Sequence, residues 1–200
     1  MSRAVALFLS YVIHPVLMPT LGVVAILALT PYYIPQSIYL MVILYVFLGT
    51  YILPAFLIFS FYKLGLVASM HLQEAKERRY PYLLSALFFY LTAQSVQNFP
   101  VPDTVAKYLL AGVLLLVIAL LLLNFTKISA HMAGLGGLFG VIIYISNAFN
   151  MQLLLIICVV ILLAGFLASA RLTLKAHTAF EVYAGFLIGL TCVFFVLILT

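Results

Sequence analysis

The chain is organised around seven long apolar runs, separated by short polar or turn-forming segments. The hydrocarbon core of a bilayer, about 30 Å thick, is crossed by roughly 20 helical residues, and most of these runs are long enough to do so. The sequence therefore predicts an all-α fold, a polytopic bundle of about six to seven transmembrane helices forming a single membrane domain. The expected helices are 4–29, 39–62, 81–98, 105–124, 132–146, 151–170 and 179–199.

The scarcity of charged residues supports this fold class. Hydrophobic residues make up 68% of the chain and charged residues 6%, whereas soluble domains carry about 25% charged residues. The chain cannot cover a soluble globule with polar surface, and it is far too apolar to be disordered. Its nine Lys and Arg residues are scattered and form no basic stripe that would bind DNA or RNA. The expected surroundings are a lipid bilayer, and nucleic acid is excluded as a partner.

Proline and glycine mark two kinds of helix feature. His14, Pro15 and Pro19 interrupt the first apolar run, and proline removes a hydrogen bond within a helix, so a kink or break is predicted there. The fifth run is short and rich in glycine, which predicts close helix packing or a helix that starts below the membrane surface. Gly185 and Gly189 have the spacing of small residues at helix–helix contacts, which favours packing within the chain and is also compatible with a homodimer.

The charged residues gather at one end of the predicted bundle. With seven spans, the N-terminus and the loops at 63–80, 125–131 and 171–178 share one side, and of the nine cations Lys107 alone falls on the other. The positive-inside rule would explain this bias by placing the crowded side in the cytoplasm. Histidine and glutamate gather on the same side, which also indicates a functional site. The cations on this side are Arg3, Lys63, Lys76, Arg78, Arg79, Lys127, Arg171 and Lys175.

The strongest local signal lies before the last apolar run, where Arg171, His177 and Glu181 follow one another. Residues four apart on a helix share a face, so His177 and Glu181 can meet. A carboxylate bound to one imidazole nitrogen fixes the tautomer and leaves the other nitrogen free as a nucleophile or base. Arg171 supplies a forked donor suited to phosphate oxygens. The structural alternative is that Arg171 anchors a helix end to headgroups while His177 and Glu181 form a stabilising pair.

A second signal, Ser129 followed by His131, lies between the fourth and fifth runs. A serine hydroxyl and the backbone N–H groups at a helix start can hold an anion, and a neighbouring histidine can protonate a departing oxygen. The structural alternative is an N-cap serine with an interfacial histidine.

A third signal is the basic cluster of Lys76, Arg78 and Arg79 before the third run. These cations could neutralise phosphate charge, or they could form a juxtamembrane loop that attracts anionic headgroups. Together the three signals offer two histidines, a carboxylate, a serine and several cations on one side. These are the groups that phosphoryl transfer through a phosphohistidine requires.

The order and spacing of these residues resemble the type 2 phosphatidic acid phosphatase superfamily, in a divergent, bacterial-type form. Its third motif, Ser-Arg-x5-His-x3-Asp, is matched in spacing from Arg171 to Glu181, with Ala170 for the serine and glutamate for the aspartate. Its second motif, Pro-Ser-Gly-His, is matched at Ser129 and His131. Its first motif, Lys-x6-Arg-Pro, is matched least well, with Tyr80 inserted after Arg79 and leucine at position 72 where the lysine would stand. The resemblance covers residues 70–190, while residues 1–62 form two leading spans outside it.

The resemblance implies a membrane lipid phosphatase that hydrolyses a lipid phosphate or pyrophosphate. It implies His177 as nucleophile, Glu181 as its orienting carboxylate and His131 as acid/base. Phosphate would be held by Arg171, Ser129, Arg79, Lys76 and Arg78. No metal or other cofactor is implied, and the expected partner is a phosphorylated membrane lipid.

Three alternatives to this function stay open at the level of sequence. One is a protein of the same fold that binds or transports a phosphorylated lipid without turnover. Another is a metal site built from His131, His177 and Glu181, because histidine and carboxylate at this spacing can bind zinc. The last is a purely structural membrane protein. The expected location is the bacterial inner membrane. The membrane face is open as well, because bacterial members of the superfamily commonly act on the periplasmic face, whereas the charge bias favours the cytoplasm.

Overall fold

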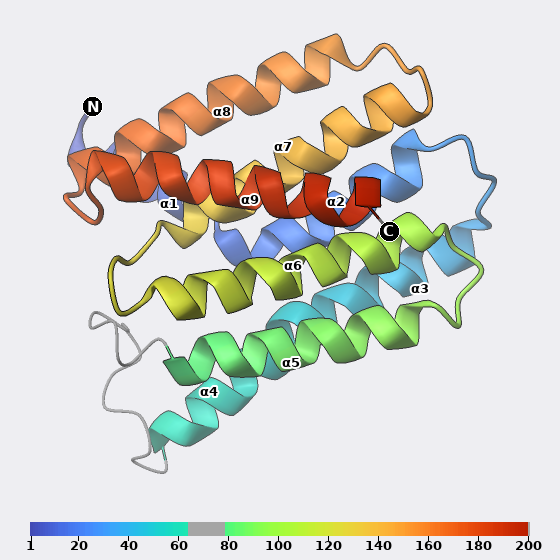
Figure 1. Cartoon of the computed structure of the whole chain (residues 1–200), viewed down its shortest axis with the longest axis horizontal. Coiled ribbons are helices and arrows are strands. Elements are labelled where there is room, and N and C mark those ends of the chain that lie inside the picture. Colours follow the sequence, from blue (N-terminus) through green and yellow to red (C-terminus); the bar gives the residue numbers. More distant parts are fainter. Residues whose placement is uncertain (64–78, 200) are drawn as a thin grey trace.

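The computed structural model describes residues 1–63 and 79–199, and within them the chain is helical with no β-strand (Figure 1). The predicted all-α fold is thereby confirmed. The helices are α1 (Arg3–Val12), η1 (Pro15–Leu17), α2 (Met18–Leu29), α3 (Gln36–Phe47), η2 (Leu48–Ile52), α4 (Leu53–Lys63), α5 (Arg79–Val96), α6 (Asp103–Leu122), α7 (Ala130–Ala148), α8 (Leu154–Thr173) and α9 (Ala179–Leu199).

Among the described residues, six helical segments are long and apolar enough to cross a membrane, as expected for a multi-pass membrane protein. Two of them are composite: the first runs through α1, η1 and α2, and the second through α3, η2 and α4. The other four are α6, α7, α8 and α9. The remaining helix, α5, has 18 residues and packs along α6, but it is less apolar and is not among the six.

The first span is broken where the sequence predicts a break. Helix α1 ends at Val12, and a short 3-10 turn with Pro15 in its first position leads into α2. The imidazole Nδ1 of His14 accepts a hydrogen bond from the backbone N–H of Val16 at 3.4 Å and so caps this turn. A proline at the start of a helical turn is tolerated because that N–H has no partner within the turn.

The second span contains a π-helical turn that the sequence analysis did not predict. It covers Leu48–Ile52 and ends where the N–H of Leu53 bonds to the carbonyl of Leu48. Pro54 follows directly and has no N–H to offer the preceding turn. A proline at this position therefore accounts for the local change in hydrogen-bond register.

Small residues bring α9 against α7 near the centre of the bundle. A Cβ atom on Gly189 would overlap the backbone carbonyl of Ala133, and one on Gly185 would lie 2.8 Å from the carbonyl oxygen of Ser129. Only glycine permits this approach of the two backbones. The Gly185–Gly189 pair therefore serves packing within the chain, and a homodimer would have to use another surface.

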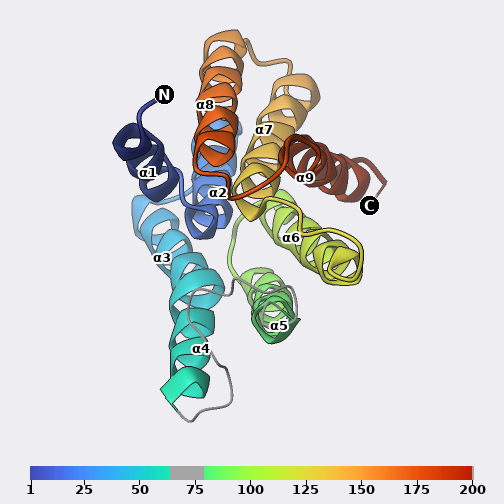
Figure 2. The same ribbon diagram turned by 90° about the vertical axis from the view of Figure 1, so that its left-hand side faces the viewer.

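The two chain termini lie at opposite ends of the bundle (Figure 1). The end that carries the N-terminus also carries the α6–α7 and α8–α9 connections, as the predicted topology requires. Figure 2 looks onto this end and shows α1 beside α8, with α7 between α8 and α9. The two best-matched signals in the sequence thus come to one end of the bundle, next to the first helix.

Candidate histidine site

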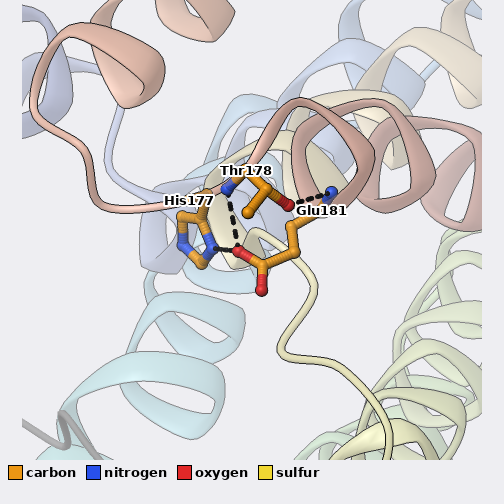
Figure 3. Close-up of polar contacts among 3 residues, drawn as sticks. All are labelled: His177, Thr178 and Glu181. Atoms are coloured by element: carbon orange, nitrogen blue, oxygen red, sulfur yellow. Dashed lines mark hydrogen bonds and ion pairs between the residues drawn. The ribbon is translucent and has the colours of Figure 1, made fainter.

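His177 lies in the connection between α8 and α9 and is held by Glu181 (Figure 3). Its Nδ1 is 3.0 Å from Oε2 of Glu181, and the side chains of His177 and Glu181 are only 4% and 12% exposed. A carboxylate at Nδ1 favours the tautomer in which Nδ1 carries the proton, so that Nε2 keeps its lone pair. The predicted pairing is present, although His177 precedes α9 and does not belong to it.

Glu181 also closes the N-terminus of α9 through a capping box with Thr178 (Figure 3). Oε2 of Glu181 accepts from the backbone N–H of Thr178 at 3.1 Å, and Oγ1 of Thr178 accepts from the backbone N–H of Glu181 at 3.3 Å. The Thr-x-x-Glu signature of this box was present in the sequence but was not used in its interpretation. The box gives a physical reason for glutamate at position 181. Its Oε2 accepts both from the backbone N–H of Thr178, which caps α9, and from the imidazole of His177.

Ser129 is fully buried immediately before α7. Its backbone N–H donates to the carbonyl of Glu181 at 3.0 Å, which ties the second sequence signal to the third. Its hydroxyl does not cap α7 and has no hydrogen-bond partner among the residues that the structure describes. Ser129 is thus the N-cap residue of α7, as the structural alternative expected, but it accepts from the N–H of Ala133 through its backbone carbonyl at 2.9 Å and not through its side chain. A buried hydroxyl without a partner is destabilising, which favours a role in binding a ligand.

His131 lies in the first turn of α7, one residue after the helix begins and not in the preceding loop. Its Nε2 is 3.1 Å from the backbone carbonyl of Ser10. This carbonyl lies in the last turn of α1, where helix carbonyls have no partner within the helix. Because a carbonyl only accepts, Nε2 carries the proton, and Nδ1 of His131 is the nitrogen available for chemistry.

Arg171 lies in the last turn of α8 and reaches the same serine. Its Nη1 donates to Oγ of Ser10 at 3.2 Å, so the buried Ser10 binds His131 through its carbonyl and Arg171 through its hydroxyl. The guanidinium also acts electrostatically on the imidazoles of His14 and His131. Helix α1 therefore holds two of the predicted site residues in place.

His14 joins the site from the break between α1 and η1. Its ring centroid is 5.4 Å from that of His131, and the two rings meet edge to face at 72°. The sequence analysis assigned no function to His14 and did not consider Ser10. The sequence signal that could have indicated a role for His14 is its position next to Pro15 inside an apolar run.

Within the described residues the basic cluster is represented by Arg79, whose hydrogen bond does not go to the histidines. Nη2 of Arg79 donates to the side-chain oxygen of Asn124 at 2.6 Å, beyond the C-terminal end of α6. Lys76 and Arg78 lie outside the described residues. The predicted residues that the structure brings to one place are His177, Glu181, Ser129, His131 and Arg171.

The metal alternative finds no donor set in the described part of the chain. Within residues 1–63 and 79–199, no group of three or more His, Cys, Asp or Glu side chains is arranged to hold a metal ion. His131, His177 and Glu181 therefore do not form such a group. The chemistry available to these side chains is nucleophilic attack, proton transfer and anion binding.

An apolar cavity of about 330 Å³ lies between the helices and is lined in part by sequence neighbours of His14 and Ser129. Its lining includes Pro15 and Val16, which follow His14, and Ile128 and Ala130, which flank Ser129. It continues between helices that are predicted to lie within the membrane. Further lining residues include Tyr82, Ser85 and Phe89 of α5, Tyr108 and Leu116 of α6, and Val193 of α9.

The site therefore combines three imidazoles, a carboxylate, a guanidinium and a buried hydroxyl. Comparison of the chain with family models, with curated proteins and with solved structures gives no match.

Proposed function

We propose that the protein is a membrane lipid phosphatase that hydrolyses a lipid phosphate or pyrophosphate through a phosphohistidine, as the resemblance to the type 2 phosphatidic acid phosphatases implies. The observation that carries the proposal is the buried His177–Glu181 pair, tied through the backbone of Ser129 to the second histidine motif. A carboxylate-oriented imidazole beside a second imidazole and an arginine suits nucleophilic phosphoryl transfer.

In the first step, Nε2 of His177 attacks phosphorus and forms an N–P bond while the P–O bond to the lipid breaks. Glu181 stabilises the positive charge that the imidazole acquires. His131 enters this step doubly protonated, with Nε2–H bound to the carbonyl of Ser10, and becomes neutral when it gives the Nδ1 proton to the departing oxygen. Arg171 and the hydroxyl of Ser129 are the described groups suited to holding the phosphoryl oxygens.

In the second step, a water molecule attacks the phosphohistidine. Nδ1 of His131 accepts a proton from this water, the N–P bond breaks, and inorganic phosphate leaves. His177 returns to its neutral form with Nδ1 facing Glu181. His131 thus acts as the acid in the first half-reaction and as the base in the second, and it ends in the protonated form that the next cycle requires.

The apolar cavity supports a lipid as the substrate. Residues adjacent in sequence to His14 and Ser129 contribute to its lining, which consists largely of apolar side chains of predicted membrane helices. Each methylene group of a lipid chain buried there would contribute about 0.8 kcal/mol. A phosphate held at the histidines with its hydrocarbon chain in this cavity is the arrangement that we propose.

The test is phosphate release by the purified protein in detergent with EDTA present, across phosphatidic acid, phosphatidylglycerophosphate, a polyprenyl pyrophosphate and a lipid A phosphate. Release of inorganic phosphate from at least one of them is expected. If the protein binds these lipids but releases phosphate from none, the transport or binding alternative replaces the enzyme.

Filling the cavity is expected to separate lipid binding from chemistry. In Ser85→Phe, a ring would occupy space that the proposed lipid chain uses, so KM for a long-chain lipid phosphate should rise about tenfold, equivalent to about 1.4 kcal/mol. Hydrolysis of the soluble substrate p-nitrophenyl phosphate should change less than threefold. Ser85→Ala, which leaves the cavity open, serves as the control. Equal losses on both substrates would argue against a lipid chain in this cavity.

Removing the buried hydroxyl of Ser129 is expected to raise stability and lower activity together. Ser129→Ala relieves an unsatisfied buried group, which should increase the free energy of unfolding by about 1 kcal/mol. Loss of a phosphate-binding donor should reduce kcat/KM by about 10- to 100-fold. Ser146→Ala is the matched control, because the hydroxyl of Ser146 donates to the carbonyl of Met151 at 2.8 Å. This control should lose stability and keep activity, and a destabilised Ser129→Ala would contradict the account.

A further inference from the structure

We propose that His14, from the leading span, is a further phosphate-binding residue of the histidine site. This inference rests on the proposed function and extends the site beyond the residues that the sequence motifs assign. The first span lies outside the part of the chain that the resemblance covers, yet it contacts the site through Ser10 of α1 and through His14 at the break before η1.

The first argument concerns the tautomer of His14. Its Nδ1 accepts a hydrogen bond from the N–H of Val16, so the proton of the neutral ring resides on Nε2. The nitrogen on the far side of the ring is therefore a hydrogen-bond donor. Among the described residues, no hydrogen bond from this nitrogen to a protein group is present.

The second argument concerns where the ring lies. His14 is half-buried and meets His131 edge to face, and the guanidinium of Arg171 is close enough to act on both rings electrostatically. Within the described residues, the ionisable side chains that affect His131 electrostatically are Arg171, His14 and His177. A cluster made of a cation and imidazole donors favours an anionic ligand.

The third argument concerns rigidity. The break that positions His14 is fixed by Pro15 and by the cap to Val16, and the adjoining end of α1 is fixed by the contacts of Ser10 to His131 and Arg171. A donor on a fixed backbone loses little entropy when it binds an oxygen. We assign to Nε2 of His14 a hydrogen bond to a non-transferred phosphoryl oxygen. No covalent bond to His14 forms or breaks.

Two substitutions separate this role from a purely structural one. Asparagine places its oxygen near the position of Nδ1 and can keep the cap to Val16, but it has no group at the position of Nε2. Glutamine reaches the position of Nε2 with its amide and loses the cap. His14→Asn should therefore weaken binding of an anion, whereas His14→Gln should retain most of it.

The measurement is calorimetric binding of orthovanadate to purified wild-type protein and to both variants in the same detergent. We expect His14→Asn to raise Kd about tenfold, equivalent to about 1.4 kcal/mol, and His14→Gln to stay within about threefold of wild type. Thermal unfolding of each variant verifies folding. A loss confined to His14→Gln, an equal loss in both variants, or no change in either would overturn the assignment.

This measurement does not depend on turnover, so it distinguishes two kinds of failure. If wild-type protein binds orthovanadate but releases phosphate from no lipid, the phosphatase proposal fails and the His14 assignment is still decided by the two variants. If wild-type protein does not bind orthovanadate, the anion site and the role of His14 in it are both overturned.

Discussion

Replacing His177 with asparagine is expected to reduce phosphate release by about 10⁴-fold or more, because it removes the proposed nucleophile. The amide of asparagine can still donate to Glu181 in place of Nδ1, which is 3.0 Å from the carboxylate, so the fold around α9 should be retained. Initial rates of phosphate release, measured on protein matched for elution profile and thermal unfolding, give the comparison.

Lys107→Gln is the control for this substitution. Lys107 lies near the start of α6, at the end of the bundle away from the histidines, so its loss should leave the rate within about twofold of wild type. Substantial residual activity in His177→Asn would rule out His177 as the nucleophile.

Glu181→Gln is expected to reduce kcat by about 10³- to 10⁴-fold, as loss of the orienting carboxylate does in hydrolytic triads. In the wild-type chain, Oε2 of Glu181 accepts both from the imidazole of His177 and from the N–H of Thr178. The amide oxygen of glutamine in the same place can accept both hydrogen bonds, so the capping box is preserved. The substitution removes the negative charge that stabilises the positively charged phosphohistidine. The rate should therefore fall while the unfolding transition hardly moves.

Thr178→Ala, in the same turn, is expected to have the opposite effect: lower stability with nearly unchanged activity. It removes the hydroxyl that accepts from the N–H of Glu181 and should lower stability by about 1 kcal/mol. The pairing of Glu181 with His177 does not use this hydroxyl, so kcat should change less than threefold. If Glu181→Gln lost stability and kept activity, Glu181 would be a helix cap only.

The fold was predictable because its main determinants are local in the sequence. Apolar run length gave the membrane helices, and the prolines beside His14 gave the break in the first span. The pairing of His177 with Glu181 was predictable for the same reason, since both lie within one turn of chain. Local spacing also contained the capping box, which the sequence interpretation overlooked.

The contribution of the leading span could not be predicted from spacing. Ser10 contacts His131 and Arg171 across 121 and 161 residues, and no periodicity within one helix reports such a contact. It depends on α1 packing against α8 and on a carbonyl left without a partner where α1 ends. The hydrogen bond from Arg79 to Asn124 is likewise long-range, and sequence spacing had suggested phosphate as the partner of this arginine.

The most direct test of the account is to trap the covalent intermediate. Protein incubated with a ³²P-labelled lipid phosphate and quenched in alkali should carry label that is stable to base and labile to acid, as expected of a phosphohistidine. Peptide mapping should place the label on His177, and His177→Asn should carry none. A wild-type protein that releases phosphate without becoming labelled, or that carries the label on another residue, would contradict His177 as the nucleophile.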